Sequence, residues 1–119
     1  MPGLAAAFLL AGCSNGQEEV SKPRVAGADA GTGKRLVTQY QCGTCHVIPD
    51  VQGAGGDTGP SLEHVARLSY IAGRIPNRPD NMVAWLRNPP ALKPGTIMPA
   101  MGISEQEARH MAAYLYTLE

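Results

Sequence analysis

The sequence predicts a single small all-α domain. Apolar residues recur every three or four positions in three segments, residues 30–40, 80–88 and 104–118, as is typical of helices with one buried face. No segment shows the alternation of apolar and polar residues that marks a half-buried strand. A chain of 119 residues has room for one domain, and we expect its helices to be joined by long loops.

The first helix carries Leu36, Val37 and Tyr40 on one face and runs directly into the sequence Cys42-Gly43-Thr44-Cys45-His46. Residues 47–59 follow, with one proline, four glycines and two aspartates, and are expected to form a loop.

Prolines divide the middle of the chain. Pro60 suits the first turn of a short helix, which we expect over residues 61–68. Residues 70–80 contain two prolines and two arginines and are expected to form a loop. The helix over residues 80–88 has to end before Pro89-Pro90, because proline disfavours the helical conformation of the residue before it.

The last helix, residues 104–118, begins with a capping box in which Ser104 and Glu107 each accept the other's backbone N–H. We expect Arg109 and His110 to lie on its exposed side. The expected buried stripe consists of Ala108, Met111, Ala112, Leu115 and Leu118.

Composition limits the core that this chain can build. Only 5% of the residues are aromatic, and Phe and Trp occur once each, so a large self-sufficient core is not expected. A flat, apolar, covalently held cofactor would complete it. Lys plus Arg equals Asp plus Glu, at 10 each, and this balance gives no indication of a nucleic-acid partner.

Cys42, Cys45 and His46 have the spacing of a c-type haem attachment site. Residues three positions apart share one face of a helical turn, so both sulfurs can reach the two vinyl groups on one edge of a porphyrin. The imidazole of His46 then points at the iron. The motif predicts one covalent haem c.

Two other interpretations of the cysteine pair remain open. A redox dithiol would normally lie in a βαβ pattern, of which the sequence gives no sign. A tetrahedral zinc site needs a second pair of ligands, and only Cys13, His64 and His110 remain as soft ligands.

The N-terminal end has the features of an export signal. Residues 4–10 are apolar but far too few to cross a bilayer, which takes about 20 residues. Leu10-Ala11-Gly12-Cys13 resembles the lipobox of bacterial lipoproteins, in which cleavage leaves a lipidated cysteine. We expect a signal segment over residues 1–12, lipidation at Cys13, a flexible tether over residues 13–28 and a folded domain over residues 29–119. A buried helix and an ordinary cleaved signal are the alternatives.

Four residues are candidates for the surroundings of the haem. The carbonyl of Pro60 can accept the second imidazole N–H of His46, as metal-bound histidines usually require. Arg74 and Arg78 can pair with the haem propionates, or lie in a solvated loop. Trp85 can pack on the ring, which at a helical position is nearly the same as ordinary core packing.

A methionine is the expected second ligand of the iron, because a thioether is a soft ligand that suits haem iron. Met98 lies between rigid turn residues and is preferred, with Met101 as the alternative; the one not used would fill a gap in the core. His64 would bind the iron only if both methionines failed to do so.

Taken in order, these motifs resemble the class I cytochromes c over roughly residues 30–119. Gly59-Pro60 and Ala112-Ala113-Tyr114-Leu115 extend the resemblance beyond the attachment motif, as do Trp85-Leu86-Arg87-Asn88-Pro89 and Pro94-Gly95-Thr96-Ile97-Met98. More narrowly, residues 59–101 resemble the cytochrome c domain fused to subunit II of bacterial haem–copper oxidases, although here we expect the domain to stand alone behind a lipid-anchor signal.

The resemblance implies three main helices around one haem, with the N- and C-terminal helices crossing. It implies thioether bonds at Cys42 and Cys45, His46 as proximal ligand, Met98 as distal ligand, and a hydrogen bond from His46 to Pro60. It also implies export, because bacteria attach haem covalently outside the cytoplasm.

We therefore expect a single-electron carrier, not an enzyme, held at the periplasmic side of a bacterial membrane. Histidine and methionine together fill the iron's positions and leave none for a substrate. The expected partner is a respiratory complex such as a terminal oxidase, or an upstream electron donor. A haem sensor or enzyme with an open distal site, and a fixed subunit of a larger redox complex, are the alternatives.

Overall fold

The computed structural model of the protein describes residues 1, 3, 12 and 23–119. Most of the predicted signal segment, the predicted lipidation site Cys13 and most of the predicted tether lie outside the described residues. In chain order the elements are α1 (Ala30–Gln39), η1 (Cys42–Thr44), η2 (Val65–Arg67), β1 (Tyr70–Ile71), β2 (Ile75–Pro76), α2 (Pro79–Arg87), α3 (Pro89–Leu92) and α4 (Glu105–Leu115).

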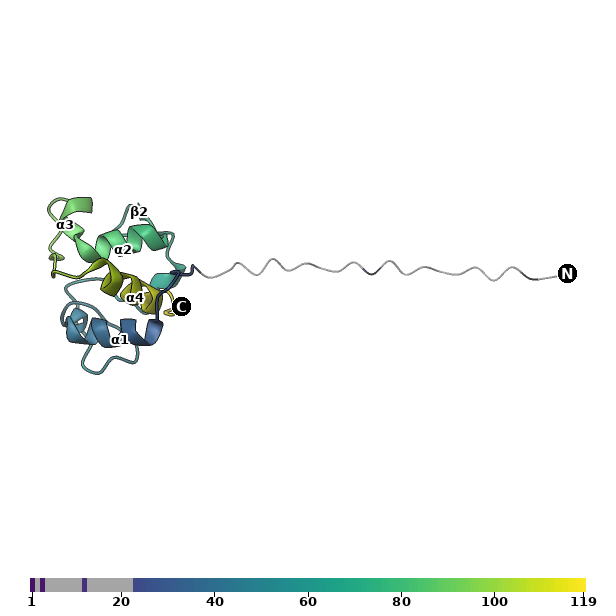
Figure 1. Ribbon diagram of the computed structural model, residues 1–119, viewed down its shortest axis with the longest axis horizontal. Coiled ribbons are helices and arrows are strands. Elements are labelled where there is room, and N and C mark those ends of the chain that lie inside the picture. Colours follow the sequence, from purple (N-terminus) through teal and green to yellow (C-terminus); the bar gives the residue numbers. More distant parts are fainter. Residues whose placement is uncertain (2, 4–11, 13–22) are drawn as a thin grey trace.

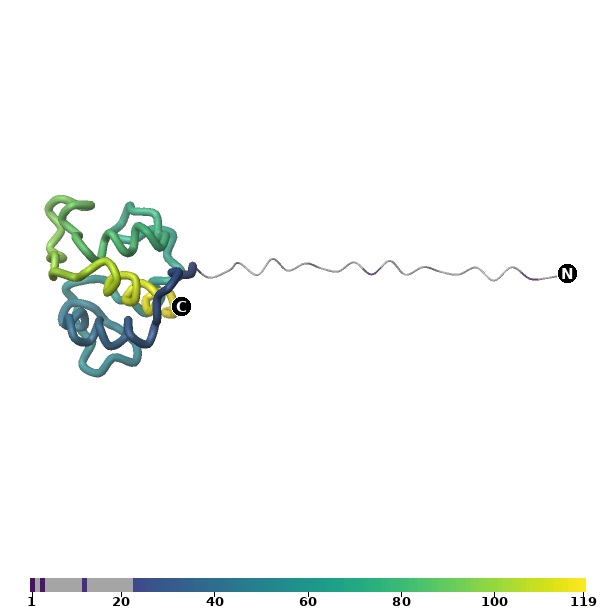
Figure 2. Tube along the Cα trace, in the orientation of Figure 1, coloured from purple at the N-terminus to yellow at the C-terminus, as the bar shows by residue number. Residues whose placement is uncertain are grey.

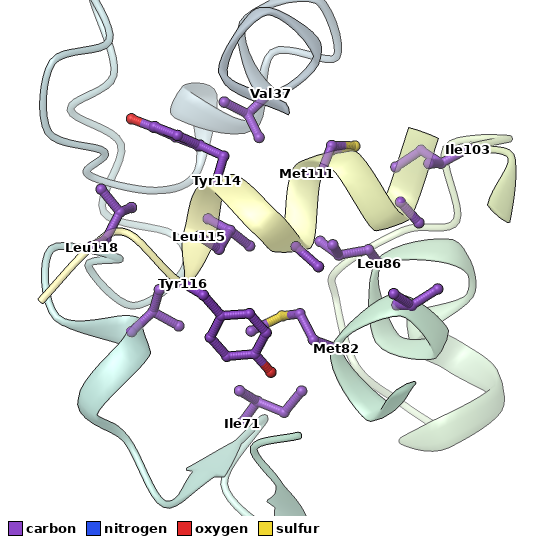
Figure 3. Close-up of a cluster of buried hydrophobic side chains, with 14 of the residues drawn as sticks. Val37, Ile71, Met82, Leu86, Ile103, Met111, Tyr114, Leu115, Tyr116 and Leu118 are labelled. Carbon is purple, nitrogen blue, oxygen red and sulfur yellow. The ribbon is translucent and has the colours of Figure 1, made fainter. Parts of the chain in front are cut away.

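The C-terminal helix α4 is the centre of the domain. It lies between α1 and α2 and packs against both (Figure 1). Met111 is fully buried on the side of α4 where Val37 of α1 lies, and Met82 and Leu86 of α2 lie on the other side of α4 (Figure 3). The apolar residues of three helices that are distant in sequence thus share one core, as the helical spacing predicts.

The crossing of α1 and α4 depends on Gly33. A Cβ atom at this position would overlap the carbonyl group of His110 and lie 2.9 Å from the Cβ of Tyr114. The two helix backbones therefore approach more closely than any residue larger than glycine allows.

Hydrogen bonds hold both ends of this helix pair. The backbone N–H of Asp29 donates to Nδ1 of His110 at 2.8 Å, and the Tyr40 hydroxyl donates to Glu107 at 3.0 Å. The predicted capping box is confirmed: Ser104 accepts from the Glu107 N–H, and Glu107 accepts from the Ser104 N–H. The hydrogen bond from the Ser104 backbone lowers the pKa of Glu107.

Arg109 and His110 are not on an exposed side, which corrects the prediction. Both are partly buried, because the chain that precedes α1 crosses this part of α4. The Arg109 guanidinium donates to the carbonyl of Ala26 at 2.6 Å, and Val25 packs against the core. The described end of the predicted tether is therefore in contact with the domain.

The helix predicted over residues 61–68 is wrong, and only the three residues of η2 are helical. The Leu62 N–H donates to the carbonyl of Val47 at 2.9 Å, so the start of this segment is bound to the preceding loop instead of to itself. The loop predicted over residues 70–80 contains a small hairpin in which Tyr70 pairs with Pro76 and Ile71 with Ile75. Strands of two residues are too short to produce a detectable alternation.

Loops connect the helices elsewhere, and among the residues that the structure describes no helix is long and apolar enough to span a membrane.

We expect Gly33→Ala to destabilise the protein by about 1–3 kcal/mol, because the methyl group would force α1 and α4 apart. Gly31 is a matched control on the same helix, since a Cβ there would only make an ordinary contact of 3.5 Å with Asp29. Gly31→Ala should be neutral or stabilise by up to about 1 kcal/mol. Denaturant unfolding measures both, and equal effects would contradict the importance of the close crossing.

Candidate haem-attachment site

The two cysteines lie on a tight turn directly after α1. Gln41 has a left-handed backbone, with φ of 56°, and turns the chain into η1. The N–H groups of Cys45 and His46 both donate to the carbonyl of Cys42, at 3.2 and 3.1 Å. This turn brings the two sulfur-bearing residues and the histidine together, and both cysteines are free thiols.

The surroundings of Cys42 do not favour a redox dithiol. Burial raises the pKa of the Cys42 thiol, and the neighbouring Cys45 shifts it in the same direction. Dithiol oxidoreductases instead lower the pKa of the attacking cysteine so that it reacts as a thiolate. Cys42 is partly buried beside the core and lacks that activation.

His46 is fixed by the residue that the sequence predicted. Its Nδ1 lies 2.7 Å from the carbonyl oxygen of Pro60. A carbonyl can only accept a hydrogen bond, so Nδ1 is the donor. Nε2 is the ring nitrogen left to bind a metal, and the hydrogen bond fixes the orientation of the ring.

The backbone of Gly59 lies against the His46 ring, a contact that the sequence did not predict. A Cβ on Gly59 would overlap the His46 ring, lying 2.8 Å from Nδ1 and 3.0 Å from Nε2. The Gly59 N–H also donates to the Cys45 carbonyl at 2.7 Å. The imidazole thus lies directly on the backbone of residue 59, and the only sequence signal for this contact is a glycine beside a proline.

The two candidate methionines differ in burial. Met98 is partly buried against the core, whereas Met101 is 47% exposed. The Met98 N–H lies 3.4 Å from Oγ1 of Thr96, and the Thr96 N–H donates to the carbonyl of Lys93 at 3.1 Å. These contacts order the loop around Met98, in agreement with the expectation that Met98 lies between rigid turn residues.

The remaining candidates fall into two groups. Trp85 is partly buried against the core, as ordinary packing requires. Arg74, Arg78 and His64 are exposed. The structure thus brings Cys42, Cys45, His46 and Pro60 together and places Met98 and Trp85 against the core of α4.

The zinc alternative gains no support. Among the residues that the structure describes, no group of three or more His, Cys, Asp or Glu side chains is close enough to hold a metal ion. Cys42 and Cys45 have only His46 beside them as a further soft ligand.

Comparison with known proteins agrees with this geometry. The family model for cytochrome c matches residues 30–119. The chain belongs to the cytochrome c family. The predicted class I c-type cytochrome and its helical fold are thereby confirmed.

Cytochrome c oxidase subunit 2 of Alkalihalophilus pseudofirmus is 34% identical over 91 residues, which cover 76% of this chain and 26% of that protein. The same subunit of Bacillus subtilis is 28% identical over 91 residues, or 73% of this chain and 26% of that protein. This cytochrome c chain thus spans about a quarter of the length of these relatives.

Among solved structures, that of SoxXA from P. pantotrophus has a TM-score of 0.58 at 22% identity, over 76% of this chain and 82% of that chain. This likeness concerns the fold alone.

The residues present fit a haem c group. Two free thiols, an imidazole with a fixed lone pair and a thioether form a suitable set of donors. Four large apolar side chains of the folded domain are exposed, at Leu68, Tyr70, Ile97 and Met101.

We expect Gly59→Ala to reduce the yield of haem-loaded protein about tenfold, because the methyl group would push the His46 ring off the Pro60 carbonyl. Gly55 lies in the same loop, has no atom within 4 Å of an added Cβ, and serves as the control. The measurement is the ratio of haem absorbance to protein after maturation in cells. Equal loading of Gly59→Ala and Gly55→Ala would contradict the role assigned to Gly59.

Proposed function

We propose that this cytochrome c is a single-electron carrier with one haem, attached through Cys42 and Cys45 and ligated by His46 and Met98. The observation that carries the proposal is the 2.7 Å contact between His46 and the Pro60 carbonyl, directly beside the two free thiols. Family membership indicates haem-based electron transfer. The site residues are the side chains that we assign to the attachment and ligation of the haem.

The haem, when bound, supplies a one-electron iron couple, and the chain sets its properties. Pro60 and Gly59 hold the His46 ring in one orientation from two sides. Met98 contributes a thioether, a ligand that raises the reduction potential of a haem. Because both ligands belong to ordered loops, a change of iron charge requires little rearrangement of the chain.

The donor set argues against an enzyme. If His46 and Met98 both bound the iron, they would leave no position for oxygen or a substrate. Neither ligand has to leave for an electron to pass through an exposed edge of the group. Transfer of single electrons is therefore the function that the donor set supports best.

We propose a respiratory complex, such as a terminal oxidase, as the electron-transfer partner. Support comes from the relatives, which are cytochrome c oxidase subunits 2. The lipobox-like sequence ending at Cys13 supports a lipid anchor at the periplasmic face of a bacterial membrane. A flexible tether of about 15 residues would give the domain an r.m.s. reach of about 20 Å.

We expect matured wild-type protein to show a c-type spectrum with a methionine–iron band, and no change when carbon monoxide is added to the reduced form. A sealed iron has no free position for the gas. Prompt binding of carbon monoxide by the wild type would overturn the carrier proposal in favour of a sensor or enzyme with an open site.

Met98→Ala should bind carbon monoxide and have a lower reduction potential, because the distal position loses its thioether. Met101→Ala is the matched control on the same loop and should leave both properties nearly unchanged, since Met101 is half exposed. The reverse pattern would assign the distal ligand to Met101.

A mobile carrier should separate from its partner during purification. We expect the protein to elute alone after detergent extraction of membranes, and to be re-oxidised when returned to membranes that contain an active oxidase. Recovery in a stable stoichiometric complex would instead identify a fixed subunit.

A further inference from the structure

We propose that Asn77 is a positioning residue for the haem pocket. Its side chain fixes the segment of residues 60–70, which begins at the carbonyl that holds His46 and ends at exposed apolar residues. This inference rests on the proposed function, and its test below separates the two.

Asn77 makes an unusually complete set of hydrogen bonds. Its Nδ2 donates to the carbonyls of Val65 and Leu68, both at 2.8 Å, and its Oδ1 accepts from the Tyr116 hydroxyl at 3.0 Å. Its backbone N–H also donates to the carbonyl of Ser69 at 3.0 Å. The two carbonyls can only accept, so the orientation of the amide is determined.

Both side-chain bonds are made to carbonyl groups at the end of the turn η2. The turn η2 ends at Leu68, whose backbone is extended, with φ of −72° and ψ of 136°. The end of a helical turn leaves carbonyl groups without partners inside the turn. Asn77 supplies the donor for the Leu68 carbonyl and a second donor for the Val65 carbonyl, which also accepts from the Leu68 N–H at 3.3 Å. Its amide therefore determines the path of the chain into β1.

The segment that Asn77 holds has a haem-site residue at its start and apolar residues at its end. Pro60 accepts from His46, and Leu62 ties the start of the segment to Val47. At the other end Leu68 and Tyr70 are 49% and 57% exposed. Those two side chains adjoin the backbone groups that Asn77 binds, so their position depends on its amide.

Tyr116 connects the Asn77 side chain to the buried core. The residue follows α4, is 3% exposed, and extends its ring between Met82 and Ile71 (Figure 3). Burial raises the pKa of Tyr116 to about 12, which keeps the hydroxyl a neutral donor at physiological pH. The buried core therefore orients Asn77, and Asn77 orients the segment.

Loss of the Asn77 side chain should admit water to the haem site. In Asn77→Ala the Leu68 carbonyl loses its side-chain donor and the Val65 carbonyl keeps only the Leu68 N–H, so the segment gains freedom at its apolar end. Because water favours the more highly charged oxidised iron, the reduction potential should fall. Amide hydrogen exchange at Arg67 and Leu68 should be faster by about tenfold, as loss of one net hydrogen bond implies.

Asn77→Asp keeps the size of the side chain but removes both N–H donors. Its carboxylate faces two carbonyl groups when ionised, and can donate one hydrogen bond when protonated. The reduction potential of this variant should therefore be lower than that of the wild type at neutral pH and should recover in part as the pH falls. A residue with a merely structural role would not add such a pH dependence.

The experiment compares Asn77→Ala and Asn77→Asp with Asn81→Ala in the haem-loaded protein. Asn81 is the matched control, since its Nδ2 makes one hydrogen bond, to the carbonyl of Pro76 at 2.8 Å, near the same end of α2. We expect the lower potential and faster exchange only at position 77, with a smaller change in Tyr116→Phe, which loses one hydrogen bond.

Unchanged potential and unchanged exchange in both Asn77 variants would overturn the inference. It would also be overturned if Asn81→Ala shifted both quantities equally. Neither result would affect the electron-carrier proposal, which is tested by carbon monoxide binding to the wild type.

Discussion

The close crossing of α1 and α4 at Gly33 is the constraint on which the remaining structure depends. It places the end of α1, and therefore the turn with Cys42 and Cys45, at a fixed position relative to the core. The same α4 carries Met111 on the side of α1 and contacts α2 as well (Figures 1 and 3). Because α4 packs against both α1 and α2, the attachment turn and the loop around Met98 are positioned relative to the same helix.

Hydrogen bonds and close backbone contacts then fix the loops relative to these helices. On one side the Pro60 carbonyl and the Gly59 backbone confine His46. On the other, Asn77 binds the end of the same segment and is itself held by Tyr116. Long loops without regular structure can therefore hold precise positions, since their carbonyl groups have partners in distant parts of the chain.

Much of the fold and site could be predicted from local chemistry. Helical spacing, the capping box at Ser104 and the attachment motif each involve residues within a few positions of one another. The helix predicted over residues 61–68 was wrong because Leu62 bonds to Val47, a partner 15 positions away that no local pattern reveals. The same holds for the contact of Arg109 with Ala26, which made a predicted exposed residue partly buried.

That last contact determines which part of the molecule can face a partner. Residues 25–28 enter the domain beside α4, on the side away from α3, while the chain around Met98 lies at the α3 side (Figure 2). The surface of α4 at Arg109 is therefore covered by the domain's own chain and is closed to a second molecule. A docking protein has to approach elsewhere, where side chains such as Ile97 and Met101 are exposed.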